Sequence, residues 1–527
     1  MEIQKTAVAE EVGVNSKAVL DMLDAIEKSG ANNHSLIIIR NGKLAVEKYT
    51  APYSAKYAHS MFSVSKSFVA LAVGFLIDEG YLTLDTPILD ILPEYESYKT
   101  DKRYGRVTVR ALLTMHSGKK CTFIRNMAKG DYAEIFMRAP FEKKVEFVYS
   151  NDDVYMLAKA VNKLTGLTLV DYLMPRIFEP LDIDRPFWEQ TQQGIEAGAT
   201  GLYLKTMDLA KVCLCYLNGG KWGDKQVIPQ EWTKTAGQYH VKLPSYYLSS
   251  KDYGFYFWGD PFGGYRFDGM FGQWGIVLPK YNAVIALTDC SNYERAILEI
   301  IFKFIPEIFA ESGKESGREG GAEALAARIA KEAEIKLPIK RMKETEKKIN
   351  GNSYKLRNPL IPKIFELAGY PISMISGPIT AAFPRKPWKN RNDFKFDFYD
   401  GYCTLTWRED TDVNTVKCGM NGGYIEDEIT LAAMPFKTLS YAYWKDEKTL
   451  FVELRIIETL AYQKITFTFD KDKITAKFVS VPDFAEWAVT HMDEVAGAPE
   501  FLINLEHRVV KAVLKAADPI FKGRKNG

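Results

Sequence analysis

The chain has 527 residues, of which 46% are hydrophobic and 26% are charged. This length exceeds the roughly 250 to 300 residues at which single cores stop growing, so the sequence predicts two or more globular domains. The proportions of hydrophobic and charged residues are those of globular proteins, which excludes a mainly disordered or fibrous chain. The 69 basic and 67 acidic residues nearly cancel to a net charge of +2. Composition therefore indicates neither a nucleic acid nor an anionic membrane as a partner.

The N-terminal residues and the cysteines favour a cytoplasmic location. Residues 1–17 lack the apolar stretch of a secretory signal. The longest apolar run, Phe68 to Ile77, is shorter than the roughly 18 residues of a membrane span. The six cysteines are scattered, and neither they nor the histidines have the spacing of a zinc site. We expect reduced cysteines, no metal and no cofactor.

Strands and helices are mixed in the first 310 residues. Residues 35–40 and 43–48 read as two strands of a hairpin, because Asn41-Gly42 supplies the positive φ of a type I′ turn. Helices are expected at about 64–79, 152–165, 206–217 and 293–309. Further strands are expected at 253–258 and 275–288.

The second half of the chain changes character after a flexible connector. Residues 311–323 are rich in glycine, serine and charge, and a charged helical stretch follows to about 348. Strand signals at hairpin spacing then dominate and predict an antiparallel barrel. The expected organisation is a mixed α/β (α+β) domain at 1–310, a linker at 311–345, an all-β barrel-like domain at 346–485 and a helical tail at 486–527.

The first candidate for chemistry is Ser63-Val-Ser-Lys66, at the start of a predicted helix. A serine and a lysine three residues apart share a helix face, and the helix N-terminus directs N–H groups and a positive dipole at the hydroxyl. A lysine must be desolvated to accept a proton near neutral pH, and the apolar run after Lys66 suits this. The alternative is a buried helix with a polar start, and Ser117-Gly-Lys-Lys120 matches the same pattern in a predicted loop.

The second candidate is Phe147-Val-Tyr-Ser-Asn151, where a short strand breaks into a helix. Tyr149 at this corner could carry a proton if a cation such as Lys66 stabilised its phenolate, and the two groups would titrate together. Asn151 offers an amide for positioning a substrate. Tyr216-Leu-Asn218 has the same spacing but falls near the end of a helix, so context favours Tyr149.

The third candidate is the glycine-punctuated stretch at 267–279, which runs into a strand. Glycine within a strand often marks the close approach of a ligand or of another backbone. Its candidate substrate-binding residues are Met270, Phe271, Gly272, Gln273 and Trp274. Phe271 and Trp274 belong to an aromatic-rich region and are candidates for an apolar wall.

These segments, in this order, resemble the β-lactamase-related serine hydrolases, which include class C β-lactamases, D-aminopeptidases, D-Ala-D-Ala carboxypeptidases, esterases and 6-aminohexanoate-dimer hydrolase. The resemblance covers about residues 15–305. It rests on five segments: SVSKSF, VTVRALLTMHSG, FVYSNDDVYMLAKAVNKLTG, ATGLYLKTMDLAKVCLCYLNGG and GMFGQ. It implies a β-lactamase/transpeptidase-like domain, an antiparallel sheet flanked by helices, followed by the small β-barrel that some relatives carry.

The resemblance also implies roles for individual residues. It makes Ser63 the nucleophile, Lys66 and Tyr149 the proton carriers, and Asn151 a substrate ligand. The backbone amides of Ser63 and Gln273 are then the oxyanion donors. This chain departs from the family at Met270, where β-lactamases have the lysine of K-T-G and many relatives have a histidine. Without that cation, substrates with a carboxylate should bind less well.

The resulting hypothesis is an acyl-enzyme hydrolase of amides or esters in small molecules or short peptides. One alternative is a carboxylesterase. Another is a catalytically weak penicillin-binding-like protein used for ligand binding or assembly. No nucleic-acid or membrane partner is expected, and a homo-oligomer is possible.

Overall fold

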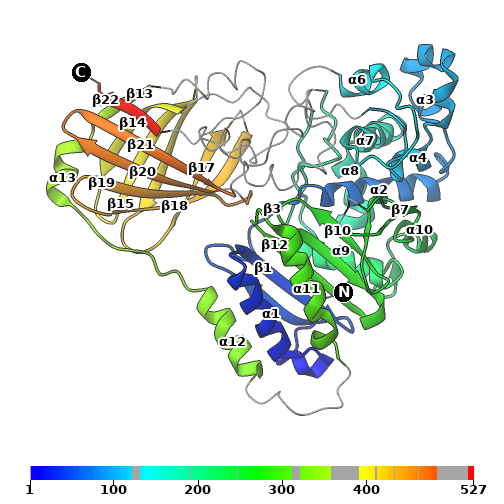
Figure 1. The fold of residues 1–527 in the computed structure, drawn as a ribbon, viewed down its shortest axis with the longest axis horizontal. Helices are drawn as coiled ribbons and strands as arrows, with labels where there is room; N and C mark the ends of the chain where they lie inside the picture. Colours follow the sequence, from blue (N-terminus) through cyan, green and yellow to red (C-terminus); the bar gives the residue numbers. More distant parts are fainter. Residues whose placement is uncertain are drawn as a thin grey trace. The chain divides into compact units, whose positions relative to one another are not determined.

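The structure is a computed structural model. It describes residues 2–120, 131–191, 193–245, 247, 249–310, 321–357, 391–409, 412–431, 434–460, 462–482 and 520–526. The chain divides into two compact units (Figure 1). The described residues of Met1–Thr50 and Ala58–Lys331 belong to the first unit, and those of Ala51–Tyr57, Glu332–His491 and Glu500–Gly527 belong to the second. Seven residues from the N-terminal part, Ala51–Tyr57, therefore pack with the second unit.

An antiparallel sheet forms the centre of the first unit, with strand order β2-β1-β12-β11-β10-β9-β8-β7. Its strands are β1 Asn33–Arg40, β2 Lys43–Tyr49, β7 Val241–Lys242, β8 Asp252–Tyr253, β9 Trp258–Gly259, β10 Tyr265–Gly269, β11 Gln273–Leu278 and β12 Ala283–Asp289. The predicted hairpin is β1–β2, and its turn residues Asn41 and Gly42 have φ of 53° and 74°, as a type I′ turn requires. Because β1 lies inside the sheet it is buried almost throughout, whereas the edge strand β2 alternates.

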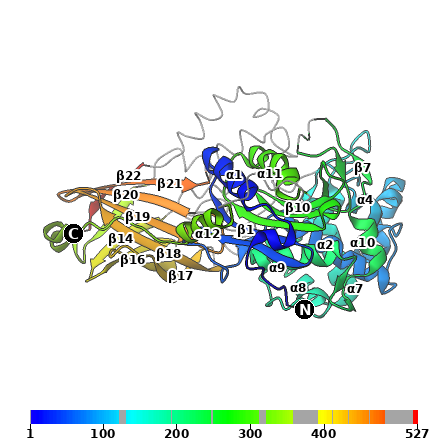
Figure 2. The ribbon, with the colours of Figure 1, turned by 90° about the horizontal axis from the view of Figure 1, so that it is seen from below.

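Helices cover both faces of this sheet (Figure 2). Helices α1 (Ser16–Lys28) and α11 (Glu294–Ile308) pack on one face, where Met22, Ile276 and Ile301 share a core. Helices α2 (Val64–Asp78) and α9 (Thr206–Leu217) lie on the other face. Every residue of α2 from Val64 to Leu76 is buried. Its N-terminus is therefore fixed by packing all around the helix.

The long predicted helices of this unit are confirmed. They are α2, α7 (Asn151–Thr165), α9 and α11, and Gly166 ends α7 with a φ of 71°. The other helices are α3 Ile88–Ile91, α4 Val109–Leu113, α6 Tyr132–Arg138, α8 Leu169–Leu173, α10 Gln230–Ala236 and α12 Gly321–Glu332. Short 3₁₀- or π-helical segments are Ala9–Val12, Pro93–Thr100, Lys102–Arg106, Met174–Phe178 and Pro279–Tyr281. Two-residue strands pair as β3 His59–Ser60 with β4 Tyr203–Leu204, and β5 Lys221–Trp222 with β6 Lys225–Gln226.

The predicted strand at 253–258 is wrong as a single element. It forms β8 and β9, joined by a tight turn in which Tyr256 has a φ of 63°. Gly254 lets this turn lie directly against the end of α10, because a Cβ there would meet the Ala236 carbonyl oxygen at 2.5 Å. The stretch at 275–288 is likewise divided into β11 and β12 by the turn at Pro279.

The second unit contains the predicted antiparallel barrel. Its strands are β13 Ser353–Arg357, β14 Arg391–Phe398, β15 Tyr402–Glu409, β16 Asp412–Gly419, β17 Ile425–Leu431, β18 Met434–Trp444, β19 Thr449–Ile456, β20 Tyr462–Asp470, β21 Lys473–Val481 and β22 Ile520–Lys525. They follow the order β16-β15-β14-β13-β22-β21-β20-β19-β18-β17. A parallel bridge from Gly419 to Tyr441 joins β16 to β18 and closes the barrel, while helix α13 (Lys343–Ile349) precedes it. Its interior is packed with aromatic rings such as Phe394, Phe396 and Phe467.

The predicted helical tail needs a correction at its end. Residues 483–519 lie outside the described residues, but Ile520–Lys525 is strand β22, which pairs with both β13 and β21. Its partner β13 lies far away in the sequence, so local patterning carries no signal for this pairing. In the part of the chain that the structure describes, no helix has the length and apolar character needed to cross a membrane.

Candidate active site

Ser63 lies at the N-cap of α2, directly after a residue with unusual backbone geometry. Phe62 has a φ of 46°, in the left-handed region, which costs about 1 to 2 kcal/mol for a non-glycine residue. The Phe62 side chain is buried, and its ring meets that of Phe271 edge-on at 5.6 Å. This sharp turn places the Ser63 hydroxyl at the positive end of the buried helix α2.

Lys66 contacts the Ser63 hydroxyl from one turn along α2. Its Nζ donates hydrogen bonds of 2.8 Å to Ser63 Oγ and of 2.8 Å to the Ala199 carbonyl oxygen. The residue is only 2% exposed. The predicted serine–lysine pair is therefore present as a direct contact in a buried setting, which meets the geometric requirement for proton transfer between the two groups.

Tyr149 is the third group at this point. The Lys66 Nζ lies 4.8 Å from the centroid of its ring. Ser150 is the N-cap of α7 and Asn151 is the first residue of that helix, so the helix begins where predicted. The short strand predicted before it is wrong, because residues 142–150 belong to no strand. The structure thus places the Ser63 hydroxyl and the Tyr149 ring next to the Lys66 ammonium, although Tyr149 lies more than 80 residues further along the chain.

A buried carboxylate supports the corner that carries Tyr149 and Asn151. Asp153 Oδ1 accepts hydrogen bonds from Ser117 Oγ at 2.8 Å and from Ser150 Oγ at 2.9 Å. Burial raises the pKa of Asp153 to about 7, although both hydroxyl groups lower it. The sequence reasoning missed Asp153. The available signal was an acidic residue three positions after a serine at a predicted N-cap.

The third predicted segment approaches the nucleophile through its backbone. A Cβ on Gly269 would lie 2.4 Å from the Met61 carbonyl oxygen, so the end of β10 lies directly against the residues that precede Ser63. Phe271 and Gly272 continue with φ of 64° and 92°. The Gln273 side chain is fully buried, and its Nε2 donates to the Asp289 carbonyl oxygen at 2.6 Å.

The candidate substrate-binding residues of this segment have different surroundings. Met270 is partly exposed, whereas Phe271 is fully buried against Phe62. Trp274 lies in the core under α1 and α11, on the opposite face of the sheet from α2. The structure therefore does not bring Trp274 to Ser63.

Trp258 packs its aromatic ring against that of Tyr149. The two ring centroids are 5.5 Å apart, and Trp258 also contacts Tyr247 and Tyr253. Sequence reasoning noted the aromatic-rich region but singled out Phe271 and Trp274. No local signal distinguishes Trp258, because its position depends on the turn that separates β8 from β9.

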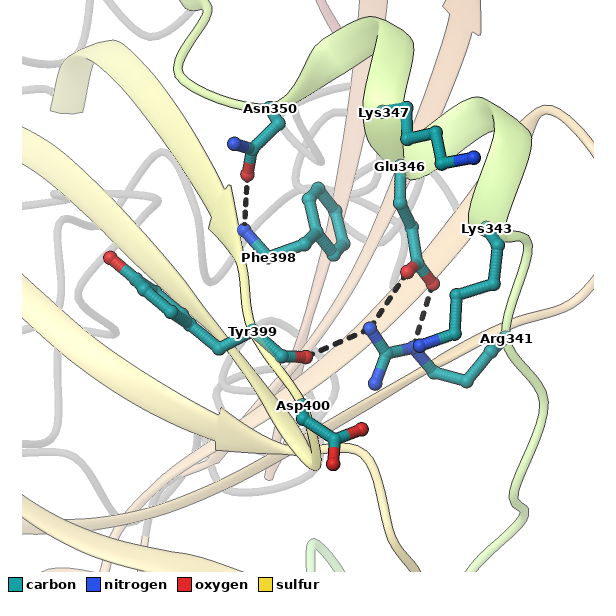
Figure 3. Close-up of a pocket in the computed structure, with 8 residues that line it drawn as sticks. All are labelled: Arg341, Lys343, Glu346, Lys347, Asn350, Phe398, Tyr399 and Asp400. Carbon is teal, nitrogen blue, oxygen red and sulfur yellow. Dashed lines mark hydrogen bonds and ion pairs between the residues drawn. The ribbon is translucent and has the colours of Figure 1, made fainter.

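A pocket in the second unit was not predicted (Figure 3). It has a volume of roughly 400 Å³ and is lined by Arg341, Lys343, Glu346, Lys347, Asn350, Phe398, Tyr399 and Asp400. The Arg341 guanidinium donates two hydrogen bonds of 2.7 Å to the Glu346 carboxylate and one of 3.0 Å to the Tyr399 carbonyl oxygen. These groups tie α13 to the turn between β14 and β15, so their main role is structural.

Comparison with known proteins identifies the family. The family model described as Beta-lactamase matches residues 22–295, more than half of the 527 residues. The chain therefore belongs to the β-lactamase family, whose members are generally serine hydrolases, and its first unit has the β-lactamase/transpeptidase-like fold. This confirms the resemblance seen in the sequence motifs.

Individual relatives cover only parts of the chain. The 6-aminohexanoate-dimer hydrolase of Paenarthrobacter ureafaciens is 26% identical over 221 residues, which is 38% of this chain and 56% of the relative. Penicillin-binding protein 4 of Amycolatopsis lactamdurans is 30% identical over 131 residues, or 23% of this chain and 33% of the relative. The octameric penicillin-binding protein homologue from Pyrococcus abyssi covers 88% of this chain and 99% of its own, at 18% identity and a TM-score of 0.43.

Proposed function

We propose that this chain is a serine hydrolase that cleaves amide or ester bonds of small molecules or short peptides through an acyl-enzyme. The observation that carries the proposal is the 2.8 Å hydrogen bond from Lys66 Nζ to Ser63 Oγ, in a site where Lys66 is buried. A surface serine and lysine would have no reason to share a proton. A buried pair at a helix N-terminus can do so, with Tyr149 as the third member.

In the proposed first step, Ser63 Oγ attacks the substrate carbonyl carbon while its proton passes to the Lys66–Tyr149 pair. The backbone amides of Ser63 and Gln273 stabilise the oxyanion, and Asn151 orients the substrate. The same pair returns the proton to the leaving amine or alcohol, which departs and leaves the acyl group on Ser63. Water, deprotonated by the same pair, then attacks the ester and releases the acid.

The substrate class is inferred from the charges near the third segment. Met270 is apolar and partly exposed where many relatives have a cation, so the site lacks a partner for a substrate carboxylate at that position. We therefore expect uncharged acyl groups to react faster than acyl groups that carry a carboxylate. The Met270→Lys variant should narrow this difference, as measured by kcat/KM on a matched pair of esters.

A fluorophosphonate probe tests the nucleophile directly. The wild type should become labelled at Ser63, and Ser63→Ala should not. Absence of labelling in the folded wild type would instead favour a catalytically weak penicillin-binding-like protein. Rates on an ester and an amide with the same acyl group separate the remaining alternatives, because a carboxylesterase would leave the amide intact.

A further inference from the structure

A short segment of the chain that precedes the nucleophile belongs to the second unit. The chain leaves the first unit after Thr50, contributes Ala51–Tyr57 to the second unit, and returns at Ala58. We call Ala51–Tyr57 the anchor segment. Strand β3 (His59–Ser60) follows almost at once, and Ser63 lies three residues beyond it at the start of α2.

Two tyrosines of the anchor segment are buried among residues of the barrel. Tyr53 is 5% exposed and Tyr57 is 6% exposed, and both pack in a cluster with Leu439 of β18 and Ile457, which follows β19. Tyr424 packs against the same cluster. Burial of large aromatic rings is the main source of contact energy in such a cluster, so the barrel holds this segment firmly.

Polar contacts fix the orientation of the same two tyrosines. Glu426 Oε2 on β17 accepts from Tyr57 Oη at 2.5 Å and from Lys56 Nζ at 2.6 Å. The Lys56 and Tyr57 hydrogen bonds hold the pKa of Glu426 below its usual range. Arg455 Nη1 donates to Tyr53 Oη at 3.3 Å, and Arg455 itself is paired with Glu453 at 2.7 Å.

Backbone hydrogen bonds hold most of the residues between the anchor segment and Ser63. After Tyr57, β3 is paired with β4, and the Met61 amide donates to the Leu202 carbonyl oxygen at 2.8 Å. Phe62 then adopts its left-handed conformation and Ser63 begins α2. A strained turn of this kind persists only where its surroundings hold it, and the chain reaches Phe62 five residues after the buried Tyr57.

We propose that the barrel unit acts as a positioning element for the nucleophile by holding the anchor segment, with Tyr57 as the main positioning residue. In this role, no described residue of the barrel takes part in the reaction itself. The barrel limits the freedom of the chain that leads into the Phe62–Ser63 turn, and so keeps Ser63 Oγ at its distance from Lys66. This inference rests on the proposed function, because it concerns the rate at which Ser63 is acylated.

The test compares acylation rates of variants on the two sides of the contact. Tyr57→Ala removes the ring, and Ile457→Ala removes a barrel residue of the same cluster without changing the first unit. Each should slow fluorophosphonate labelling of Ser63 and kcat about tenfold with KM unchanged, since a small misplacement of the nucleophile affects attack more than binding. Tyr57→Phe keeps the ring and should restore most of the rate.

A second pair of variants, with smaller structural changes, tests the same inference if Tyr57→Ala or Ile457→Ala fails to fold. Glu426→Ala removes the acceptor of Tyr57 and Lys56, and Glu428→Ala removes an exposed carboxylate on the same strand. We expect a decrease of about threefold for Glu426→Ala and none for Glu428→Ala, because of these two carboxylates it is Glu426 that accepts hydrogen bonds from the anchor segment. Amide hydrogen exchange should increase at residues 58–62 and stay unchanged in α7.

The outcomes separate this inference from the proposed function. If the wild type is not labelled at Ser63, the proposed function fails. If the wild type is labelled but the folded Tyr57, Ile457 and Glu426 variants react at its rate, the positioning role is overturned while the hydrolase proposal stands. A uniform increase of hydrogen exchange in both units would also overturn it, because that indicates general destabilisation.

Discussion

The first unit contains the Ser-x-x-Lys pattern twice, and the serine and lysine are in contact in only one of the two copies. Ser63 and Lys66 lie one turn apart on a buried helix, and the lysine Nζ contacts the serine Oγ at 2.8 Å. Ser117 and Lys120 flank a turn at Gly118, where φ is 68°. There the serine hydroxyl donates to Asp153, and Lys120 is exposed. Spacing alone therefore does not bring a serine hydroxyl and a lysine ammonium into contact.

The difference between the copies comes from the residues directly after each serine. Thirteen consecutive buried residues, Val64 to Leu76, force a helix after Ser63 and exclude water from Lys66. A glycine with positive φ comes after Ser117 and prevents a helix from continuing the pattern. The neighbouring Lys119 is buried instead of Lys120, with its Nζ donating to Tyr104 Oη and the Met137 carbonyl oxygen. The second copy therefore has a structural role, because the Ser117 hydroxyl binds Asp153, which supports the corner at Tyr149.

The sharpest test of this comparison removes the lysine from each copy. Lys66→Ala should lower the fluorophosphonate labelling rate of Ser63 by about a thousandfold, because the serine loses the group that takes its proton. Lys120→Ala should leave the rate unchanged. Quenched labelling reactions analysed by mass spectrometry give both rate constants under one set of conditions.

Two checks accompany that pair of variants. Thermal unfolding must show that Lys66→Ala is folded, since a buried lysine is being removed. Equal labelling rates for Lys66→Ala and the wild type would contradict the assignment of Lys66, even if Ser63 remained the labelled residue.

The next test removes the carboxylate on which the second copy depends. Asp153→Ala leaves the buried hydroxyl groups of Ser117 and Ser150 without their acceptor, so the free energy of unfolding should fall by about 2 to 3 kcal/mol. Urea denaturation measures this loss. Asp153→Asn keeps an acceptor oxygen and should lose less, and identical losses for the two variants would show that the hydrogen bonds do not matter.

The pH dependence of stability gives a smaller effect with a defined sign. Burial raises the pKa of Asp153 to about 7 and that of Asp289 to about 7. In the unfolded chain an aspartate titrates near pH 3.9, so between about pH 4 and pH 7 the folded protein retains protons that the unfolded chain has released. The free energy of unfolding should therefore decrease as the pH rises through this window, by at most about 1.4 kcal/mol per pH unit for each group.

The variant Asp153→Asn isolates one of these two contributions. Its free energy of unfolding should depend less steeply on pH between about 4 and 7 than that of the wild type. The exposed Asp78→Asn should keep the slope of the wild type. Urea denaturation at a series of pH values across this window provides the comparison, and parallel curves for Asp153→Asn and the wild type would show that Asp153 does not titrate in this range.

Local patterns predicted much of this fold because they act over short distances. The Asn41-Gly42 turn, the apolar run of α2 and the glycine after α7 each specify their element without help from elsewhere. The strand β22 and the turn between β8 and β9 depend on partners that are distant in sequence or on a single positive φ. Neither leaves a periodic signal, and both were missed.

The site shows the same division. Sequence patterns identified Ser63, Lys66 and Tyr149 as candidates. The structure places the Ser63 hydroxyl and the Tyr149 ring next to the Lys66 ammonium. Trp274 was proposed from its position beside Gln273, but adjacent residues of a strand face opposite sides of the sheet, so it packs in the core under α11. Asp153 was not proposed, although its place three residues after the N-cap Ser150 was a local signal. Trp258 was not proposed, because its contact with Tyr149 joins distant segments.

The smallest effect should come from Lys119, the buried lysine of the second copy. Burial lowers its pKa to about 8, and its Nζ lies 4.2 Å from the Phe141 ring centroid and 4.7 Å from that of Tyr104. Lys119→Met keeps the stem within this aromatic cluster and removes the cost of burying a charge, so stability should change by no more than about 1 kcal/mol. The labelling rate of Ser63 should stay at the wild-type value. A large loss of labelling would show that the second lysine also serves the reaction, and the contrast between the two copies would then not hold.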